Sequence, residues 1–300
     1  MEDYRQSEEF CQYLYKRGWV SEQVGSTRIL LKKIPWLGSI IKVQNGSADT
    51  SLSDIDIIAK SYKALLVVIE PCTITEDVHY VSFENELKLA GYKDLNLFMR
   101  PTKTTYIDLT KSEEAILASF DQDIRKNLNT NLSKNISFST VTNIEEIYSL
   151  IYDAGHNLNY FVQSLQKWKD QWEPFGNQVK VILATLDGKI IGGNMIVIRS
   201  PLAFGLYLPT TEIGRSTHVA GSLIWEGLKL AKKNGCTTFD LNGLYDERYK
   251  LPQAWKGLTA FKNKFKGHDV EFMRAKVKLY SGFLKPVESL GLLWMFFGDR

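Results

Sequence analysis

The stretch VKVILATLDGKIIGGNMIVIRSPLAFGLYL (residues 179–208) decides the fold. It contains two apolar runs, Val179–Leu186 and Ile190–Arg199, which meet at Asp187-Gly188. Asp-Gly between two strand-like runs is a strong signal for a two-residue hairpin turn, because both turn residues need a positive φ. Leu202–Leu208 has the composition of a third strand. The stretch therefore predicts a β-hairpin followed by one more strand.

A helix and a further strand follow this stretch. Val219–Lys233 has apolar residues at helical spacing. Gly235 is suited to end this helix, because glycine adopts the left-handed conformation of a helix cap without strain. Cys236–Leu241 is the next strand-like run. The order in this half of the chain is hairpin, strand, helix, strand.

The first half of the chain repeats this order. Arg28–Ile34 and Ser39–Val43 predict two strands around a turn, and a helix follows with Ser51 or Ser53 as its N-cap. Ala64–Ile69 (ALLVVI) predicts a strand that is covered on both faces. This order is that of half of an acetyltransferase-type α/β domain. A single α/β domain with a mixed sheet is the alternative, because periodicity does not fix strand order.

The predicted fold class is α/β (α+β), with two tandem acetyltransferase-like (GNAT-type) subdomains whose mixed sheets are flanked by helices. We expect a first subdomain at residues 1–111 and a helical connector at 112–140 that begins with Ser112 as its N-cap. A second subdomain is expected at 141–275. An apolar and basic C-terminal helix or tail is expected at 276–300.

Composition and charge exclude several classes of protein. The 300 residues are 44% hydrophobic and 24% charged, which is ordinary for a globular protein and excludes wholesale disorder. The three cysteines form no CxxC motif, and the N-terminus lacks the apolar core of a signal peptide, so we expect a cytoplasmic protein. Residues 248–300 hold 11 Lys or Arg against 4 Asp or Glu. This basic end suits an anionic partner, although a solvated basic surface is the alternative.

The motifs of several enzyme classes are absent. The chain has no GxxxxGK[ST], no GxGxxG, no HExxH and no GxSxG, and its four histidines lie at no metal-ligand spacing. We expect no metal. Coenzyme A would need a glycine-rich turn before the main helix, where bare N–H groups approach a pyrophosphate. The turn here reads Arg215-Ser-Thr-His218-Val-Ala220-Gly221, with histidine at the first glycine position. This turn argues against coenzyme A as the cofactor.

A segment with aromatic residues and lysines follows the second half. In GLTAFKNKFKG (257–267), a helix would place Leu258, Phe261 and Phe265 on one face, with Lys262 beside it. A lysine flanked by aromatic rings can hold a phosphate or stabilise an oxyanion. An amphipathic helix whose lysines extend to solvent is the alternative.

The sequence resembles the Fem family of non-ribosomal peptidyltransferases. LIWEGLKLAKKNGCTTFDLNG (223–243), followed by GLTAFKNKFKG (257–267), is similar to the family's helix, its Tyr/Phe-Asp-Leu-Gly-Gly turn and its Leu-x-x-Phe-Lys-x-x-Phe motif. TYIDL (105–109) and the basic Arg125-Lys126-Asn127 resemble a strand and a helix of the family. The resemblance covers residues 18–275 and implies two acetyltransferase-like subdomains.

The resemblance implies roles for particular residues. Lys262 falls on the lysine that the family places against the substrate phosphate and the reacting carbonyl, with Phe261 beside it. Tyr207 falls on a tyrosine near the acceptor stem, or is a residue of an edge strand. Glu70 falls where some relatives carry an acidic residue suggested as a base, or is an exposed strand end. We expect Lys262 and Glu70 to be catalytic and the remaining residues to bind substrate: Phe261, Tyr207, Arg215, Arg125 and Lys126.

The implied activity is peptide-bond formation in the synthesis of cell-wall interpeptide bridges. The donor would be an aminoacyl-tRNA, which serves as co-substrate with no cofactor, and the acceptor an amine of a peptidoglycan precursor, lipid-linked or nucleotide-linked. His156–Gln163 lacks an arginine that some relatives use on the nucleotide-linked precursor, so the acceptor stays open. The alternatives are an acyl-CoA-dependent N-acyltransferase of the same fold and a non-catalytic module that binds an anionic glycolipid or RNA.

The C-terminal segment suggests a place in the cell. Residues 283–297 are apolar and aromatic, too short to span a bilayer, and follow basic residues. They would suit peripheral contact with an acidic membrane at its inner face. A helix packed on the body of the protein is the alternative.

Overall fold

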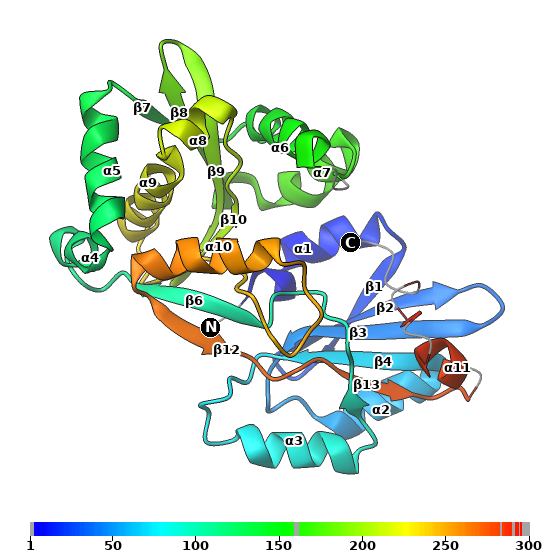
Figure 1. Ribbon diagram of the computed structural model, residues 1–300. Coiled ribbons are helices and arrows are strands. Elements are labelled where there is room, and N and C mark those ends of the chain that lie inside the picture. Colours follow the sequence, from blue (N-terminus) through cyan, green and yellow to red (C-terminus); the bar gives the residue numbers. More distant parts are fainter. Residues whose placement is uncertain (1–2, 159–161, 283, 290–291, 294, 296–300) are drawn as a thin grey trace. The chain divides into compact units, whose positions relative to one another are not determined.

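The computed structural model describes residues 3–158, 162–282, 284–289, 292–293 and 295 (Figure 1). The chain folds into two compact units that are not continuous in sequence. The N-terminal unit comprises residues 5–103, 246–251 and the described part of 270–300. The central unit comprises the described part of 1–4, with 104–245 and 252–269. The first short helix of the chain, η1 (Tyr4–Gln6), spans the boundary between the two units at residues 4 and 5.

The N-terminal unit contains a six-stranded sheet in the order β1-β2-β3-β4-β13-β5. Its neighbours β3 and β4 run parallel, and its other four neighbour pairs are antiparallel. Its strands are β1 (Trp19–Val24), β2 (Thr27–Ile34), β3 (Gly38–Gly46), β4 (Ala64–Pro71), β5 (Lys93–Asp94) and β13 (Lys276–Leu279). Its α-helices are α1 (Glu8–Tyr15), α2 (Leu52–Ser61), α3 (Tyr80–Leu89) and α11 (Leu284–Ser289).

The core of this unit follows from the predicted pattern. Every residue of β4 is buried, as the run ALLVVI predicts. Ile55 and Ala59 of α2 and Phe83 and Leu87 of α3 pack against the strands. Ser51 caps α2, because its Oγ accepts a hydrogen bond from the Asp54 N–H at 3.2 Å.

The central unit contains a seven-stranded sheet in the order β12-β6-β11-β10-β9-β8-β7. β10 and β11 run parallel, and β7 to β10 form an antiparallel meander. Its strands are β6 (Lys103–Asp108), β7 (Ser137–Val141), β8 (Val179–Leu186), β9 (Lys189–Arg199), β10 (Leu202–Tyr207), β11 (Thr238–Asp240) and β12 (His268–Glu271). Its helices are α4 (Glu113–Ser119), α5 (Gln122–Ser133), α6 (Glu145–Leu158), α7 (Leu165–Trp172), η2 (Glu173–Gln178), α8 (Glu212–Ser216), α9 (Val219–Lys233), α10 (Ala254–Lys262) and η3 (Asn263–Phe265).

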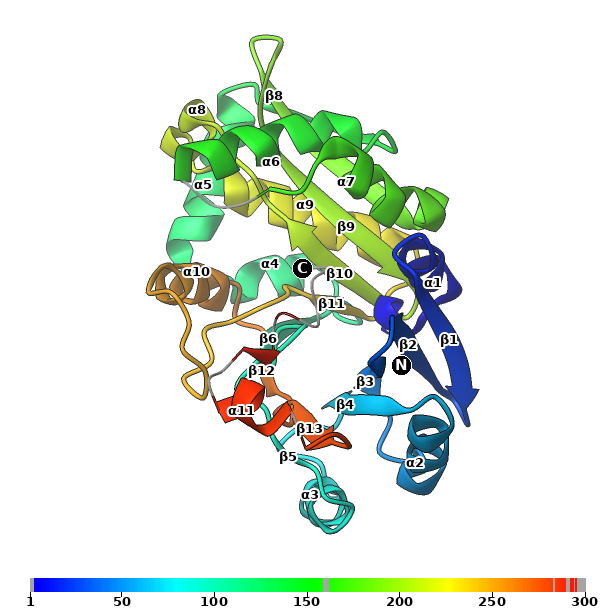
Figure 2. The ribbon, with the colours of Figure 1, turned by 90° about the vertical axis from the view of Figure 1, so that its right-hand side faces the viewer.

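Helices cover both faces of the central sheet. α5 and α9 lie on one face, and α6 and α7 lie on the other (Figures 1 and 2). The hairpin between β8 and β9 turns at Asp187 and Gly188, which have φ values of 49° and 75°. Gly235, with φ 79°, follows the end of α9 as predicted. The stretch 179–241 therefore forms the hairpin, strand, helix and strand that its sequence predicts.

The predicted fold class is confirmed, but its linear division differs from the compact units. The chain leaves the N-terminal unit after Lys103, and residues 246–251 and 270–300 belong to that unit again. The expected connector at 112–140 holds two helices, α4 and α5, because Phe120 adopts an extended backbone between them. Its last part forms β7 of the central sheet.

The C-terminal segment is not simply a helix or tail. It begins with β13, which pairs with β4 through Lys276↔Ile69 to Leu279↔Leu66. The helix α11 follows at Leu284–Ser289. Most of residues 290–300 lie outside the described residues, as do parts of the stretch 156–163.

Candidate active site

The site begins at the turn that follows β11. Asn242 and Gly243 take φ values of 54° and 79°, a left-handed conformation in which glycine and asparagine are the favoured residues. The buried carboxylate of Asp240 fixes this turn, because it accepts hydrogen bonds from the Thr104 hydroxyl and from the Asn242 N–H at 2.7 Å. Asparagine thus stands in this turn where the Fem motif has its first glycine, and the backbone conformation explains why it is tolerated.

Lys262 closes this turn from the end of α10. Its side chain is buried, and Nζ donates hydrogen bonds to the carbonyl oxygens of Asn242 and of Gly243, the latter at 2.7 Å. The alternative that Lys262 extends to solvent is therefore wrong. Burial lowers the pKa of Lys262 to about 8, and the nearby Asp240 carboxylate opposes this shift. The site therefore holds a fixed ammonium group whose pKa lies below that of an exposed lysine.

The other lysines of this segment behave as surface residues. Lys264 forms an ion pair with Asp123 at 2.5 Å, and Lys266 forms one with Asp121 at 2.8 Å. The predicted apolar face is only partly buried, since Phe265 is fully buried whereas Leu258 is 40% exposed. The helix ends at Lys262, and the following 3-10 turn places Phe265 in the core.

A basic cavity of about 490 Å³ lies beside α10. Three of the predicted substrate-binding residues line it: Phe261, Arg215 and Lys126. Lys264 and His218 also line it, and His218 is the residue immediately before α9. The lining contains three cations, Lys126, Arg215 and Lys264, and one carboxylate, Asp123, which pairs with Lys264. The excess of positive charge suits an anionic group such as a phosphate. Lys262 is next to Phe261 in the chain but is not a lining residue.

The remaining predicted residues of the central unit lie elsewhere. Arg125 lines a shallow groove along α5, to which Lys126 also contributes. Tyr207 lies among aromatic rings, with its ring centroid 4.8 Å from that of Trp168 and 6.1 Å from that of Trp172. Neither Arg125 nor Tyr207 lines the basic cavity. The predicted substrate-binding residues thus lie in three places: the basic cavity, the groove along α5 and the aromatic cluster around Tyr207.

Glu70 belongs to the N-terminal unit, whereas Lys262 belongs to the central unit. Glu70 lies near the end of β4 and is 1% exposed, so the alternative of an exposed strand end is wrong. Its Oε1 accepts hydrogen bonds from the N–H groups of Met99 at 2.5 Å and Arg100 at 3.1 Å. Oε2 is buried without a hydrogen-bond partner among the described residues. Burial raises the pKa of Glu70, although the Arg100 guanidinium and the two N–H groups oppose this shift.

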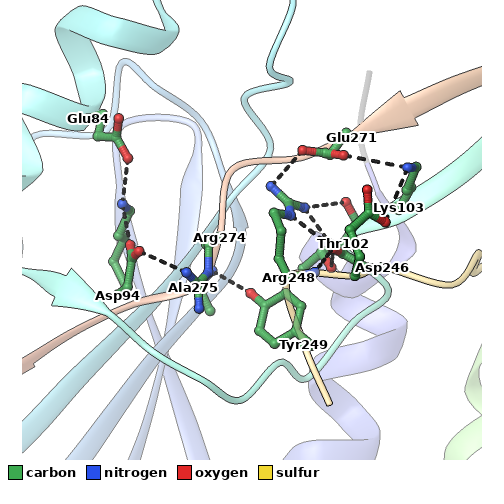
Figure 3. A network of polar contacts seen from close by, with 12 residues as sticks. Glu84, Asp94, Thr102, Lys103, Asp246, Arg248, Tyr249, Glu271, Arg274 and Ala275 are labelled. Carbon is green, nitrogen blue, oxygen red and sulfur yellow. Dashed lines mark hydrogen bonds and ion pairs between the residues drawn. The ribbon is translucent and has the colours of Figure 1, made fainter. Parts of the chain in front are cut away.

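Sequence analysis missed a polar network in the N-terminal unit (Figure 3). Asp246, almost fully buried, accepts hydrogen bonds from the Thr102 hydroxyl at 2.5 Å and from Arg248 Nη2 at 2.7 Å. Arg248 also pairs with Glu271 at 3.0 Å, and Glu271 lies 3.7 Å from Lys103 Nζ. Asp-x-Arg soon after the Asn242-Gly243 turn is the only sequence signal for this network.

Within the described ranges, no three His, Cys, Asp or Glu side chains cluster closely enough to hold a metal ion. None of the helices in the described part of the chain is both long and apolar enough to cross a bilayer.

Known structures resemble this chain in fold, whereas no family model and no curated protein match its sequence. The crystal structure of FemX is similar over 95% of this chain and 94% of that one, with a TM-score of 0.80 and 15% identity. The C-terminal domain of a protein described as a lysylphosphatidylglycerol synthetase from Agrobacterium fabrum is similar over 96% and 93%, with a TM-score of 0.60 and 15% identity. A tandem GNAT protein from the clavulanic acid biosynthesis pathway is similar over 88% and 84%, with a TM-score of 0.51 and 10% identity. The fold is therefore the tandem acetyltransferase fold, and the likeness to FemX agrees with the motifs that resemble the Fem family.

Proposed function

We propose that this chain is an aminoacyltransferase that moves an amino acid from aminoacyl-tRNA to an amine of a peptidoglycan precursor stem peptide. One observation carries the proposal. Lys262, the lysine of the Leu-x-x-Phe-Lys-x-x-Phe motif, is a buried ammonium whose Nζ binds the turn at Asn242 and Gly243, which belongs to the Phe-Asp-Leu-Asn-Gly motif. The similarity of the fold to that of FemX supports the same activity. The reaction converts an ester and an amine into an amide and releases the tRNA hydroxyl.

Lys262 supplies the positive charge in this mechanism. A tetrahedral intermediate carries a negative oxygen, and one well-placed donor to such an oxygen is typically worth about 3 kcal/mol. The Nζ of Lys262 donates to two carbonyl oxygens and an ammonium has three protons, so the turn leaves one proton unused. The ester is already activated, and no covalent enzyme intermediate is required.

The basic cavity supplies binding in this mechanism. Arg215 and Lys126 hold phosphate groups of the substrate, and Phe261 stacks on an aromatic base. Arg125 extends the basic surface along α5, and Tyr207 contacts the acceptor stem. No cofactor takes part, and aminoacyl-tRNA is the co-substrate.

Glu70 is the general base of the proposed mechanism. The attacking amine has an ordinary pKa of about 10.4, so it must lose a proton before it reacts at neutral pH. A carboxylate whose pKa is raised by burial accepts a proton more readily than an exposed one. Oε2 has no hydrogen-bond partner among the described residues, so it is the carboxylate oxygen that we assign to the proton.

An acyl-CoA-dependent N-acyltransferase is the second candidate, because the basic cavity includes residues directly before α9. A helix N-terminus binds a pyrophosphate well, and the fold resembles a tandem GNAT protein. Either enzyme would act in the cytoplasm, at the inner face of the membrane when its acceptor is lipid-linked.

Transfer of radiolabelled amino acids tests the proposal. A mixture of charged tRNAs is incubated with lipid-linked or nucleotide-linked precursor, with and without RNase, and parallel samples receive labelled acetyl-CoA. We expect RNase-sensitive label in one precursor. Label that comes from acetyl-CoA would support the second candidate instead, and tight binding without any transfer would indicate a binding module.

Variants locate the reaction. Lys262→Ala is expected to abolish transfer, whereas Lys266→Ala, which removes an exposed lysine four residues away, should retain it. Glu70→Gln keeps the shape of the side chain and should lower turnover about 100-fold or more. Circular dichroism checks that each variant is folded. Full activity of a folded Lys262→Ala enzyme would remove this lysine from the mechanism.

A further inference from the structure

The turn between β2 and β3 presents apolar side chains to solvent. Trp36 is 103% exposed and Leu37 is 54% exposed, whereas Trp19, in the same sheet, is 1% exposed. Trp36 also has a φ of 67°, which is a strained conformation for a bulky residue. Pro35 precedes it and is also exposed, so three successive apolar residues form the tip of this hairpin.

The tip is held in place by its neighbour in the sheet. The Ser39 N–H donates to the Lys63 carbonyl oxygen at 3.2 Å, and a Cβ on Gly38 would lie 2.3 Å from that same oxygen. Gly38, with a φ of 136°, therefore permits a close approach that no other residue would allow. Trp36 is exposed at the end of a fixed hairpin rather than at the end of a long loop.

The same end of the sheet is basic. Trp19 pairs with Lys32, Ser39 with Ala64, and the Tyr280 N–H donates to the Leu65 carbonyl, so four segments meet at this end. We call residues 16–19, 32–38, 62–65, 280–282 and 284–287 the basic end. These residues include six cations, Lys16, Arg17, Lys32, Lys33, Lys63 and Lys285, and no Asp or Glu. Two carboxylates border them, because the Tyr62 hydroxyl donates to Glu22 and the Tyr280 hydroxyl donates to Asp56. In Figure 1 the β2–β3 hairpin and α11 both lie at the right-hand end of this sheet.

We infer that the basic end binds the surface of an anionic phospholipid bilayer, with Trp36 and Leu37 inserted at the headgroup level. Tryptophan is favoured at this level, because its ring is apolar and its N–H finds a polar partner there. Each nearby lysine or arginine adds about 1 kcal/mol of attraction to anionic lipid, which is about fivefold in affinity. Proline and leucine beside the tryptophan suit insertion into lipid better than stacking on RNA bases. This inference goes beyond the proposed reaction, because the surface requires neither donor nor acceptor.

Binding of the full chain to vesicles tests the inference without any substrate. The vesicles contain phosphatidylcholine with either no phosphatidylglycerol or about a third of it, and bound protein is measured by flotation. We expect binding to the anionic vesicles that weakens at high salt. Trp36→Gly should lower the affinity at least tenfold, and Lys33→Ala and Lys63→Ala should each lower it about fivefold. Brominated lipid should quench fluorescence in the wild-type protein but much less in Trp36→Phe.

Val78→Ser is the matched control. Val78 is 88% exposed in the same unit, but it follows the opposite end of β4, and its loss should leave vesicle binding unchanged. Trp36→Gly relieves the positive φ, so thermal unfolding should show a fold at least as stable as that of the wild type. Absence of vesicle binding, equal binding of Trp36→Gly and wild type, or equal losses in Trp36→Gly and Val78→Ser would overturn the inference. A Trp36-dependent interaction with tRNA but not with vesicles would assign the surface to RNA instead.

Discussion

At the scale of single residues, burial decides what Lys262 can do. An exposed lysine is charged at all physiological pH values and has little reason to lose its proton. Lys262 is 8% exposed, and the loss of hydration favours its neutral form. The carbonyl oxygens of Asn242 and Gly243 favour its charged form, because they accept hydrogen bonds from the ammonium. The same side chain therefore holds the turn and has a pKa of about 8.

The titration of Lys262 predicts how stability depends on pH. The pKa is about 8 in the folded protein and 10.5 for an unperturbed lysine. Between these values the unfolded chain binds more protons, so the free energy of unfolding should rise with pH relative to that of Lys262→Met. The full difference is on the order of 3 kcal/mol, gained between about pH 8 and pH 10.5. Urea unfolding of both proteins at several pH values measures it.

Lys266→Met is the control for this experiment, because its exposed ion pair should make no comparable contribution. A constant difference between wild type and Lys262→Met from pH 7 to pH 10.5 would show that the buried ammonium has an ordinary pKa.

The sequence makes Lys262 and Glu70 candidates, but it does not predict their environments. Spacing places Lys262 beside an aromatic face, and only the structure shows that its ammonium enters a backbone turn. The carboxylate of Glu70 is buried because residues 99–100, 29 and 30 positions later, fold over it. Such contacts between distant segments have no local sequence signal.

At the scale of elements, a loop supplies the centre of the polar network of the N-terminal unit, and the ends of two strands, at Lys103 of β6 and Glu271 of β12, complete it. Asp246 and Arg248 lie in a six-residue segment, 246–251, between two segments of the central unit. Lys103 and Glu271 lie beside two other positions where the chain passes from one unit to the other. The network thus joins three such crossings by hydrogen bonds and ion pairs.

Removal of Arg248 is expected to destabilise this network strongly. Burial disfavours the ionised form of Asp246, but hydrogen bonds from Arg248 and Thr102 outweigh burial and lower its pKa. Arg248→Met leaves the carboxylate buried with one fewer cation, a change that typically costs about 3–5 kcal/mol. The loss should be visible as a lower midpoint of urea unfolding at pH 7.

A double variant separates the ion pair from general damage. Asp246→Asn combined with Arg248→Met removes both charges, and should recover part of the stability lost in Arg248→Met alone. Lys111→Ala, which breaks an exposed pair with Asp108, should change stability by less than about 1 kcal/mol. If Arg248→Met and the double variant were equally stable, the buried carboxylate of Asp246 would not need the charge of Arg248.

Periodicity predicts the inner elements of both halves but not how distant strands join them. The runs in 179–241 form the expected strands and helix because their apolar patterns and turns agree. β13 is separated from its partner β4 by about 200 residues, and its sequence, Lys276-Val-Lys-Leu279, is short and half charged. Lys276 of this strand forms ion pairs with Glu84 and Asp94, which lie far from it in the sequence. No local pattern reports such a partnership.

At the scale of the whole molecule, the order of the chain makes each unit depend on distant sequence. The N-terminal sheet takes its fifth strand in spatial order from residues 276–279, and the polar network takes Asp246 and Arg248 from residues 246–251. The division expected at residue 111 would therefore yield a first part that lacks both. The two compact units are each assembled from segments that are not continuous in the sequence, and each contains one sheet.

Truncation tests this dependence. A chain that ends at Ala275 keeps β12 but lacks β13, which leaves the fully buried strand β4 with an open edge and separates it from β5. An exposed apolar edge strand promotes aggregation, so we expect this chain to be insoluble or to lose cooperative unfolding. A chain that ends at Ser289 keeps β13 and α11 and is the matched control, which should remain soluble and unfold cooperatively. Thermal unfolding and size-exclusion chromatography compare the two. A soluble chain ending at Ala275 with the unfolding midpoint of the full protein would mean that the first sheet is complete without its C-terminal strand.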